Sequence, residues 1–133
     1  MSASRNDALV DRLATFDALV EVGVGNRPDV AGALADRGCS VVATDIYDQS
    51  VPKGVRFVRD DVTAPAADVY ADADAIYARN LPPELHRPTL ELAREHAAAF
   101  LFTTLGGEQP LVPVRRETLP VGTLFVADDT VPD

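Results

Sequence analysis

A series of short segments that are apolar at consecutive positions most constrains how this chain can fold. A strand in which every position is apolar is buried on both faces, which is typical of a parallel sheet covered by helices on each side. Glu21 is the one charged residue inside the first of these segments. We predict six strands, at Ala18–Val22, Ser40–Thr44, Val55–Val58, Asp74–Ala78, Ala99–Thr103 and Thr123–Val126.

Helical patterns separate most of these segments. A short leading helix is expected over Ser4–Ala14, with a start resembling a capping box. Pro28 suits the first turn of a second helix that Gly38 ends, and a third runs from Pro88 to about Ala97. The stretch 48–53 is too short for a helix, so one crossover is expected to be a loop. The sequence therefore predicts an α/β fold, a doubly wound, mainly parallel, truncated Rossmann-like sheet in a three-layer sandwich.

Length and composition limit the class of protein. A chain of 133 residues is expected to form a single domain, residues 1–133. It has no run of about 18 apolar residues and no apolar segment of a secretory signal near its start. Its one cysteine, Cys39, excludes an internal disulfide and fits a buried thiol at the start of a strand. We expect a cytoplasmic protein without a membrane partner.

The net charge of −9 comes from an unusual set of residues. Asp outnumbers Glu by 15 to 6, and the chain has 11 Arg but one Lys. A surface rich in carboxylates and poor in lysine suits a cytoplasm of high salt, where screening reduces the repulsion between like charges. We interpret the composition as halophilic. It weighs against nucleic acid as a partner without excluding it, since nucleic acid is usually bound by a basic face.

Polar residues or glycines follow each of the first five predicted strands. The carboxyl ends of parallel strands meet at one edge of a sheet, where such folds bind ligands. The candidate site residues at this edge are Glu21, Gly23, Gly25, Asp45, Asp60, Asp61, Arg79 and Asn80, together with Gly106 and Gly107.

The spacing of these residues suggests a ligand with a ribose. Asp45 lies 22 residues after Gly23, close to the distance of about 20 expected for an acid that binds ribose hydroxyls. A dinucleotide-binding motif would have a third glycine where this chain has Pro28, and the charge of Glu21 would oppose a pyrophosphate. A ligand with a cationic end and a ribose fits both acids better.

These motifs resemble those of the class I methyltransferases. The matching segments are VEVGVG after the first strand, TD after the second, RDD after the third and ARNLPP after the fourth. The resemblance implies that Gly23 and Gly25 surround the methionine part of S-adenosylmethionine and that Asp45 holds the ribose. It further implies that Asp60 or Asp61 recognises the adenine amine of this cofactor. Glu21 would balance or organise the cationic end of the cofactor.

Nearly the whole chain also resembles a small uncharacterised archaeal family with this Rossmann-like core. The segment Asn80–Pro83 is similar to the N-L-P-Y motif of methyltransferases that modify adenine amines, but Pro83 replaces the aromatic residue on which a flipped base would stack.

Three functions remain open at this level. The first is an S-adenosylmethionine-binding protein and possible methyltransferase of unknown acceptor, with Asn80 orienting the acceptor and Arg79 beside it. Arg79 would then pair with a nearby acid such as Glu21 or Asp45, or await an anionic acceptor. The alternatives are an oxidoreductase that uses NAD(P) and a non-catalytic binding module. We expect His86 and His96 to be exposed, Arg115 and Arg116 to be a solvated pair, and no metal site.

Overall fold

The computed structural model describes residues 6–120 and 122–128. One sheet contains seven strands in the order β3-β2-β1-β4-β5-β7-β6. Its first five strands are parallel, and β7 runs antiparallel to both β5 and β6. The bounds are β1 (Ala18–Val22), β2 (Ser40–Asp45), β3 (Val55–Arg59), β4 (Ala75–Ala78), β5 (Ala99–Phe102), β6 (Val114–Leu119) and β7 (Gly122–Ala127). The mainly parallel sheet that the sequence predicts is confirmed.

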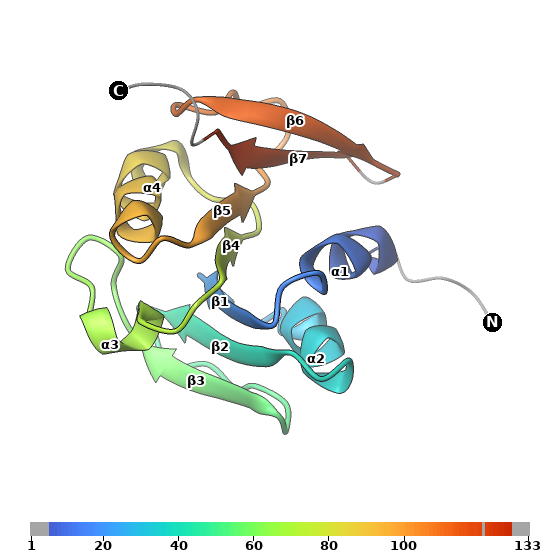
Figure 1. Cartoon of the computed structure of the whole chain (residues 1–133), viewed down its shortest axis with the longest axis vertical. Helices are drawn as coiled ribbons and strands as arrows, with labels where there is room; N and C mark the ends of the chain where they lie inside the picture. The colour runs from blue at the N-terminus through green and yellow to red at the C-terminus, as the bar shows by residue number, and fades with distance from the viewer. Residues whose placement is uncertain (1–5, 121, 129–133) are drawn as a thin grey trace.

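Helices cover both faces of the sheet, giving three layers (Figure 1). The helices α1 (Asp7–Leu13) and α2 (Asp29–Asp36) lie on one face. The other face carries α3 (Ala67–Tyr70) and α4 (His86–Glu95), the latter preceded by the 3-10 turn η1 (Pro83–Leu85). Adjacent residues of a strand enter opposite cores, because side chains alternate across a strand: Leu19 packs under α1 and α2, whereas Val20 packs under α3 and α4.

The first two strands have the predicted connection. They pair in parallel from Ala18 opposite Ser40 to Val22 opposite Thr44, and α2 joins them. Gly38 follows this helix with a φ of +90°, a conformation in which glycine is favoured, and the amide of Cys39 bonds back to Leu34 O at 3.1 Å. The connection from β2 to β3 contains no helix, as expected.

Several elements differ from the sequence prediction. The strand β6 was not predicted, because it is an edge strand whose mixed sequence VRRETL lacks an apolar run. The helix α3 has only four residues, too few for a periodic pattern. The third predicted helix begins at His86, two residues before Pro88. The capping box fell partly outside the described residues, and Asn6, which precedes α1, makes no side-chain cap.

The hairpin of β6 and β7 extends past the carboxyl ends of the parallel strands. Phe125 pairs with Phe102, the last residue of β5, so the residues of β7 before Phe125 pair only with β6. A salt bridge between Arg12 of α1 and Glu117 of β6, at 2.7 Å, connects this hairpin to the helix beside it. The extended hairpin thus forms a wall at the edge where ligands bind in such sheets.

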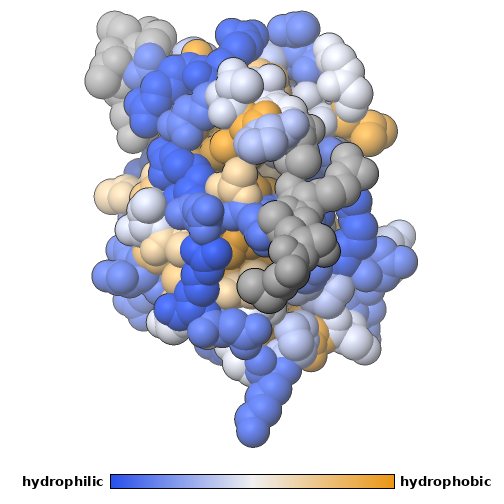
Figure 2. All heavy atoms as spheres, turned by 90° about the vertical axis from the view of Figure 1, so that its right-hand side faces the viewer, coloured by the Kyte–Doolittle hydropathy of each residue, from blue (hydrophilic) through white to orange (hydrophobic). Residues whose placement is uncertain are grey.

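One face of the molecule is mainly hydrophilic. Figure 2 shows mainly hydrophilic residues on the face seen from the right-hand side of Figure 1, with hydrophobic residues visible between them near the middle. None of the helices in the described part of the chain is both long and apolar enough to cross a membrane.

Candidate functional site

The chain reverses sharply after β1 through two glycines. Gly23 and Gly25 have φ angles of +74° and +58°, which glycine adopts without steric cost. The amides of Gly23 and Val24 both donate to Thr44 O at 2.9 Å, which fixes the turn to the end of β2. Among the described residues, no atom beyond the glycine and its two chain neighbours lies within 4 Å of the position that a Cβ would occupy at either glycine. The turn is therefore rigid and has open space beside it.

Asp45 is held against this turn. Its Oδ2 accepts the amide of Gly25 at 2.8 Å and its Oδ1 accepts the amide of Tyr47 at 3.0 Å. A carboxylate has about four acceptor positions, so each oxygen keeps capacity for another donor. The structure thus brings Gly23, Gly25 and Asp45 together, as the sequence predicts for a ribose-binding acid beside a glycine turn.

Glu21 lies behind the turn. It is 1% exposed, and its Oε1 accepts the hydroxyl of Tyr77 at 2.6 Å. The two residues are neighbours in register on β1 and β4, where the strand order reverses. Burial raises the pKa of Glu21 to about 7, although the bond from Tyr77 and the charge of Arg79 lower it.

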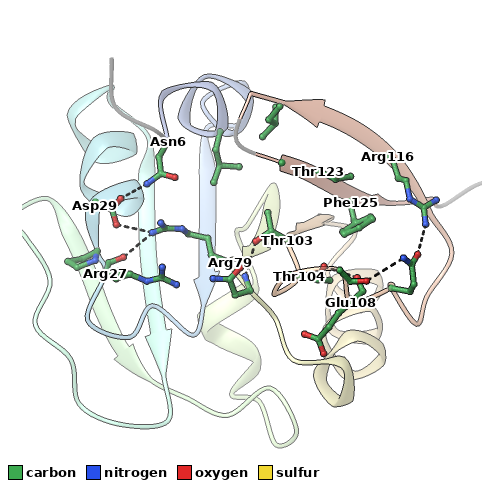
Figure 3. Close-up of a pocket in the computed structure, with 18 of the residues that line it drawn as sticks. Asn6, Arg27, Asp29, Arg79, Thr103, Thr104, Glu108, Arg116, Thr123 and Phe125 are labelled. Atoms are coloured by element: carbon green, nitrogen blue, oxygen red, sulfur yellow. Dashed lines mark hydrogen bonds and ion pairs between the residues drawn. The ribbon is translucent and has the colours of Figure 1, made fainter. Parts of the chain in front are cut away.

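Arg79 pairs with neither acid that the sequence suggested. Its Nη1 donates to Asp29 Oδ1 at 2.9 Å and to Arg27 O at 3.3 Å (Figure 3). The expected pairing of Arg79 with a nearby acid is found, but that acid is Asp29 and not Glu21 or Asp45, because α2 begins directly above the end of β4 and presents Asp29 there. The guanidinium lowers the pKa of Asp29, against the opposing effect of partial burial. This ion pair connects the strand β4 to the start of α2.

Asn80 occupies a left-handed turn with a φ of +54°. Asn is one of the few residues other than glycine that adopt this conformation readily. Its amide nitrogen in the backbone donates to Thr103 Oγ1 at 2.8 Å. The hydrogen-bond network orients the side chain so that Nδ2 donates to Thr104 O at 3.3 Å and Oδ1 accepts from Arg27 Nη2 at 3.1 Å. Asn80 thus connects the loops that follow β1, β4 and β5.

Asp60 and Asp61 both make bonds within the loop after β3. Asp60 accepts the amide of Ala66 at 3.0 Å on one oxygen and the hydroxyl of Tyr70 at 2.6 Å on the other. Asp61 Oδ1 accepts the amide and hydroxyl of Thr63, at 2.9 and 2.7 Å, and these bonds lower its pKa. Within the described part of the chain, Asp61 Oδ2 has no such donor, so Asp61 is the freer of the two.

A pocket of about 1020 Å³ lies where these loops meet the hairpin (Figure 3). Arg79 and Asn80 line it, but Glu21, Gly23, Gly25, Asp45, Asp60 and Asp61 do not. The remaining walls come from α1, the start of α2, the segment after β5, and β6 with β7. The predicted residues therefore lie in three places: at the glycine turn with Asp45, in the loop after β3 with Asp60 and Asp61, and in the pocket with Arg79 and Asn80.

His86 is buried, contrary to the prediction. It is fully enclosed, its Nε2 lies 3.0 Å from Leu81 O, and its Nδ1 accepts the amide of Leu111 at 3.1 Å. These contacts fit a neutral ring that donates through Nε2. The histidine anchors the segment after β5 to α4 and is not available as a base. Among the residues that the structure describes, no cluster of His, Cys, Asp or Glu could hold a metal ion.

Two residues next to Asp45 were missed by the sequence analysis. Ile46 and Tyr47 are two consecutive large side chains that are 51% and 65% exposed. Their position directly after a buried strand and its terminal acid was the available signal. They form an apolar surface beside the glycine turn.

The sequence is similar to a group of archaeal proteins. Residues 7–130 match the family described as "Uncharacterised protein family (UPF0146)". A relative from Halobacterium salinarum is 57% identical over 118 residues, covering 88% of this chain and 92% of the relative. Another from Archaeoglobus fulgidus is 42% identical over 90 residues, or 68% of this chain and 69% of that protein.

The fold is similar to that of solved methyltransferases. An RNA methyltransferase from Salinibacter ruber, in complex with S-adenosyl-L-homocysteine, superposes with a TM-score of 0.64 and 18% identity over 100% of this chain and 97% of that one. A TehB-like SAM-dependent methyltransferase from Corynebacterium glutamicum superposes with a TM-score of 0.63 and 15% sequence identity. The match covers 94% of this chain and 86% of the other. At these identities the likeness shows a methyltransferase-like Rossmann fold.

Proposed function

The chain belongs to the uncharacterised protein family UPF0146, and we propose that it binds S-adenosylmethionine and transfers its methyl group to a second molecule. The observation that carries the proposal is the bond from Gly25 to Asp45, which places a carboxylate with spare acceptor capacity beside an open, rigid turn. The fold shared with a methyltransferase solved in complex with S-adenosyl-L-homocysteine supports the same reading.

The residues around the turn fit the parts of this cofactor. The space above Gly23 and Gly25, which a Cβ would fill, admits the methionine part at close range. Asp45 accepts the ribose hydroxyls. Ile46 and Tyr47 offer an apolar surface to the adenine, and Asp61, the freer acid of its pair, accepts the adenine amine.

In methyl transfer the main task of the protein is to position the cofactor and the acceptor. S-adenosylmethionine carries its methyl group on a cationic sulfur. A lone pair of the acceptor forms a bond to the methyl carbon while the carbon–sulfur bond breaks, and the sulfur leaves as a neutral thioether. Approach in line is then the main requirement, so walls of fixed geometry matter more than acid–base groups. Asn80 and Arg79 line the pocket next to the turn and are themselves fixed by Arg27, Thr104 and Asp29, which suits them to orient an acceptor.

The structure favours this cofactor over a dinucleotide. Pro28 immediately precedes α2 and has no amide hydrogen to offer a pyrophosphate. Glu21 and Asp29 also place acidic groups near the start of that helix, where two phosphates would have to bind.

Thermal unfolding in a buffer of fixed high salt tests the proposal. S-adenosylmethionine and S-adenosylhomocysteine should each raise the Tm more than NAD or NADP does, and a hundredfold excess over Kd corresponds to about 2.7 kcal/mol. Asp45→Asn keeps an acceptor for Gly25 but removes the charge, so it should cost about 1–3 kcal/mol of binding. Asp48→Asn removes the same charge three residues away and serves as the control. Equal affinity of the two variants would contradict the assignment of Asp45.

Radiolabelled S-adenosylmethionine incubated with salt-matched cell extract tests the transfer step. Label should appear in extract components only when the protein is present. Binding of the cofactor without any transfer would instead indicate a non-catalytic binding module.

A further inference from the structure

The pocket beside the glycine turn is larger and more basic than a cofactor site alone requires. Its volume of about 1020 Å³ lies just above the range of about 300–1000 Å³ that small-molecule sites usually occupy. Three arginines and two acids line it, whereas the chain as a whole carries a net charge of −9. A locally basic pocket in so acidic a protein points to an anionic ligand.

The three arginines are not equivalent. Arg79 is neutralised by Asp29, and Arg27 contacts the side chain of Asn80 next to the turn. Arg116 lies across the pocket from them on the hairpin (Figure 3). Within residues 6–120 and 122–128, neither Arg27 nor Arg116 takes part in a salt bridge.

Arg116 is also held in place. Its guanidinium lies over the ring of Phe125, 5.5 Å from the centroid, and Nη2 donates to Gln109 Oε1 at 3.3 Å. Arginine has five N–H donors, so most remain for a ligand. Such a guanidinium, fixed by stacking and by a neutral amide, matches a carboxylate or a phosphate.

We propose that Arg116 binds the anionic group of the methyl acceptor, a small molecule that carries a phosphate or a carboxylate. This inference rests on the proposed function. The acceptor spans the pocket, with its anionic end at the hairpin and its nucleophilic atom near Asn80. Hydroxyls of Thr103, Thr104 and Thr123 line the path between and can bond polar groups of the ligand. A small molecule suits the site better than a nucleic acid, since the net charge of −9 on the whole chain would repel a polyanion.

Calorimetric titration of the protein with three probes, phenyl phosphate, benzoate and phenol, tests the inference. The protein is saturated with S-adenosylhomocysteine and kept at one salt concentration. We expect phenyl phosphate or benzoate, whichever matches the natural anion, to bind at least tenfold more tightly than phenol, as one charge-assisted pair provides. Arg116→Gln should remove this preference, and Arg116→Lys should retain part of it.

Arg115→Gln is the matched control. It removes the same charge from the neighbouring residue of β6, whose side chain points to the opposite face of the strand and does not line the pocket. A loss of anion binding in both variants, or equal binding of phenol and the anions to the parent, would overturn the inference. Arg116-dependent binding of a single-stranded RNA oligonucleotide that exceeds the affinity for phenyl phosphate would overturn it in favour of a nucleic-acid acceptor.

The outcome is distinguishable from a failure of the proposed function. If S-adenosylhomocysteine does not bind but the anion preference and its dependence on Arg116 are found in the protein alone, the anion site stands and its role as an acceptor site falls. If S-adenosylhomocysteine binds and no anion preference appears, the cofactor assignment stands and this inference fails.

Discussion

The hydroxyl of Tyr77 donates a 2.6 Å hydrogen bond to Glu21 Oε1, and both side chains are almost completely buried between β1 and β4. Burial raises the pKa of Glu21 from its ordinary value of 4.5 to about 7. It also raises the pKa of Tyr77, so the phenol keeps its proton and remains a donor. This pair connects β1, which leads into the glycine turn, to its neighbour β4.

The raised pKa of Glu21 predicts a stability that falls with increasing pH. Between pH 4.5 and about 7 the folded state holds a proton that the unfolded state has lost, so the free energy of unfolding decreases as the pH rises through this window. The effect is on the order of 3 kcal/mol. Denaturant unfolding at several pH values and constant salt should show it in the parent. The difference between the parent and Glu21→Gln should change by this amount across the window, and parallel curves would contradict the assignment.

Tyr77→Phe should destabilise the protein more at pH 8 than at pH 5.5. At pH 8 Glu21 is largely ionised, and removal of the hydroxyl leaves a buried charge without its donor, at a cost of about 1–3 kcal/mol. At pH 5.5 the carboxyl of Glu21 is protonated and uncharged, so removal of the hydroxyl costs less stability. Unfolding of Tyr77→Phe in the Glu21→Gln background provides the control, where this dependence on pH should disappear. A cost independent of pH in the parent background would show that Tyr77 acts through packing alone.

Gly25→Ala should separate the backbone role of the turn from its role in binding. The φ of +58° imposes a cost of about 1–2 kcal/mol on alanine, and the added methyl enters the open space beside the turn. Gly38→Ala is the control, because Gly38 also has a positive φ, +90°, and open space around it but lies after α2. Both variants should have a lower Tm than the parent. Only Gly25→Ala should bind S-adenosylhomocysteine more weakly, as measured by calorimetry. Equal affinities would place the cofactor elsewhere.

Asn80→Gly tests the role of the Asn80 side chain in catalysis without straining the backbone. Glycine accepts the φ of +54° at this position, so the variant removes the amide side chain and keeps the turn, whereas Asn80→Ala adds strain of about 1–2 kcal/mol. If Asn80 orients the acceptor, Asn80→Gly should lower methyl transfer by orders of magnitude and leave cofactor affinity nearly unchanged. Transfer at the parent rate in Asn80→Gly, with reduced stability only in Asn80→Ala, would show that Asn80 is a turn residue.

Local patterns predicted six strands, and all six agree with the structure to within one residue at each end. Short, mainly apolar runs mark such strands because helices cover the sheet on both faces. The strand β6 could not be found in this way. It is an edge strand that is half exposed, and its pairing with β7 comes from the register of the hairpin.

The sequence predicted the location of the candidate site at one edge of the sheet. It did not predict which residues contact one another there. Parallel strands necessarily bring Gly23, Asp45 and Asn80 to one side, so their placement there followed from the fold. The partner of Arg79 did not, since Asp29 reaches it only through the position of α2 above β4. The enclosure of His86 likewise depends on Leu111, 25 residues away.

The sequence by itself determined which segments are buried, where they end and which chemical groups stand at their ends, because these follow from periodicity and from turn residues that act within a few positions. Only the tertiary structure decided that Glu21 bonds to Tyr77, that Asp45 holds Gly25 and that Arg116 faces the pocket across from Arg79. The reason is that hydrogen bonds and ion pairs depend on distances of about 3 Å. Such distances between residues far apart in the chain are fixed by strand register and helix position, which no local pattern records.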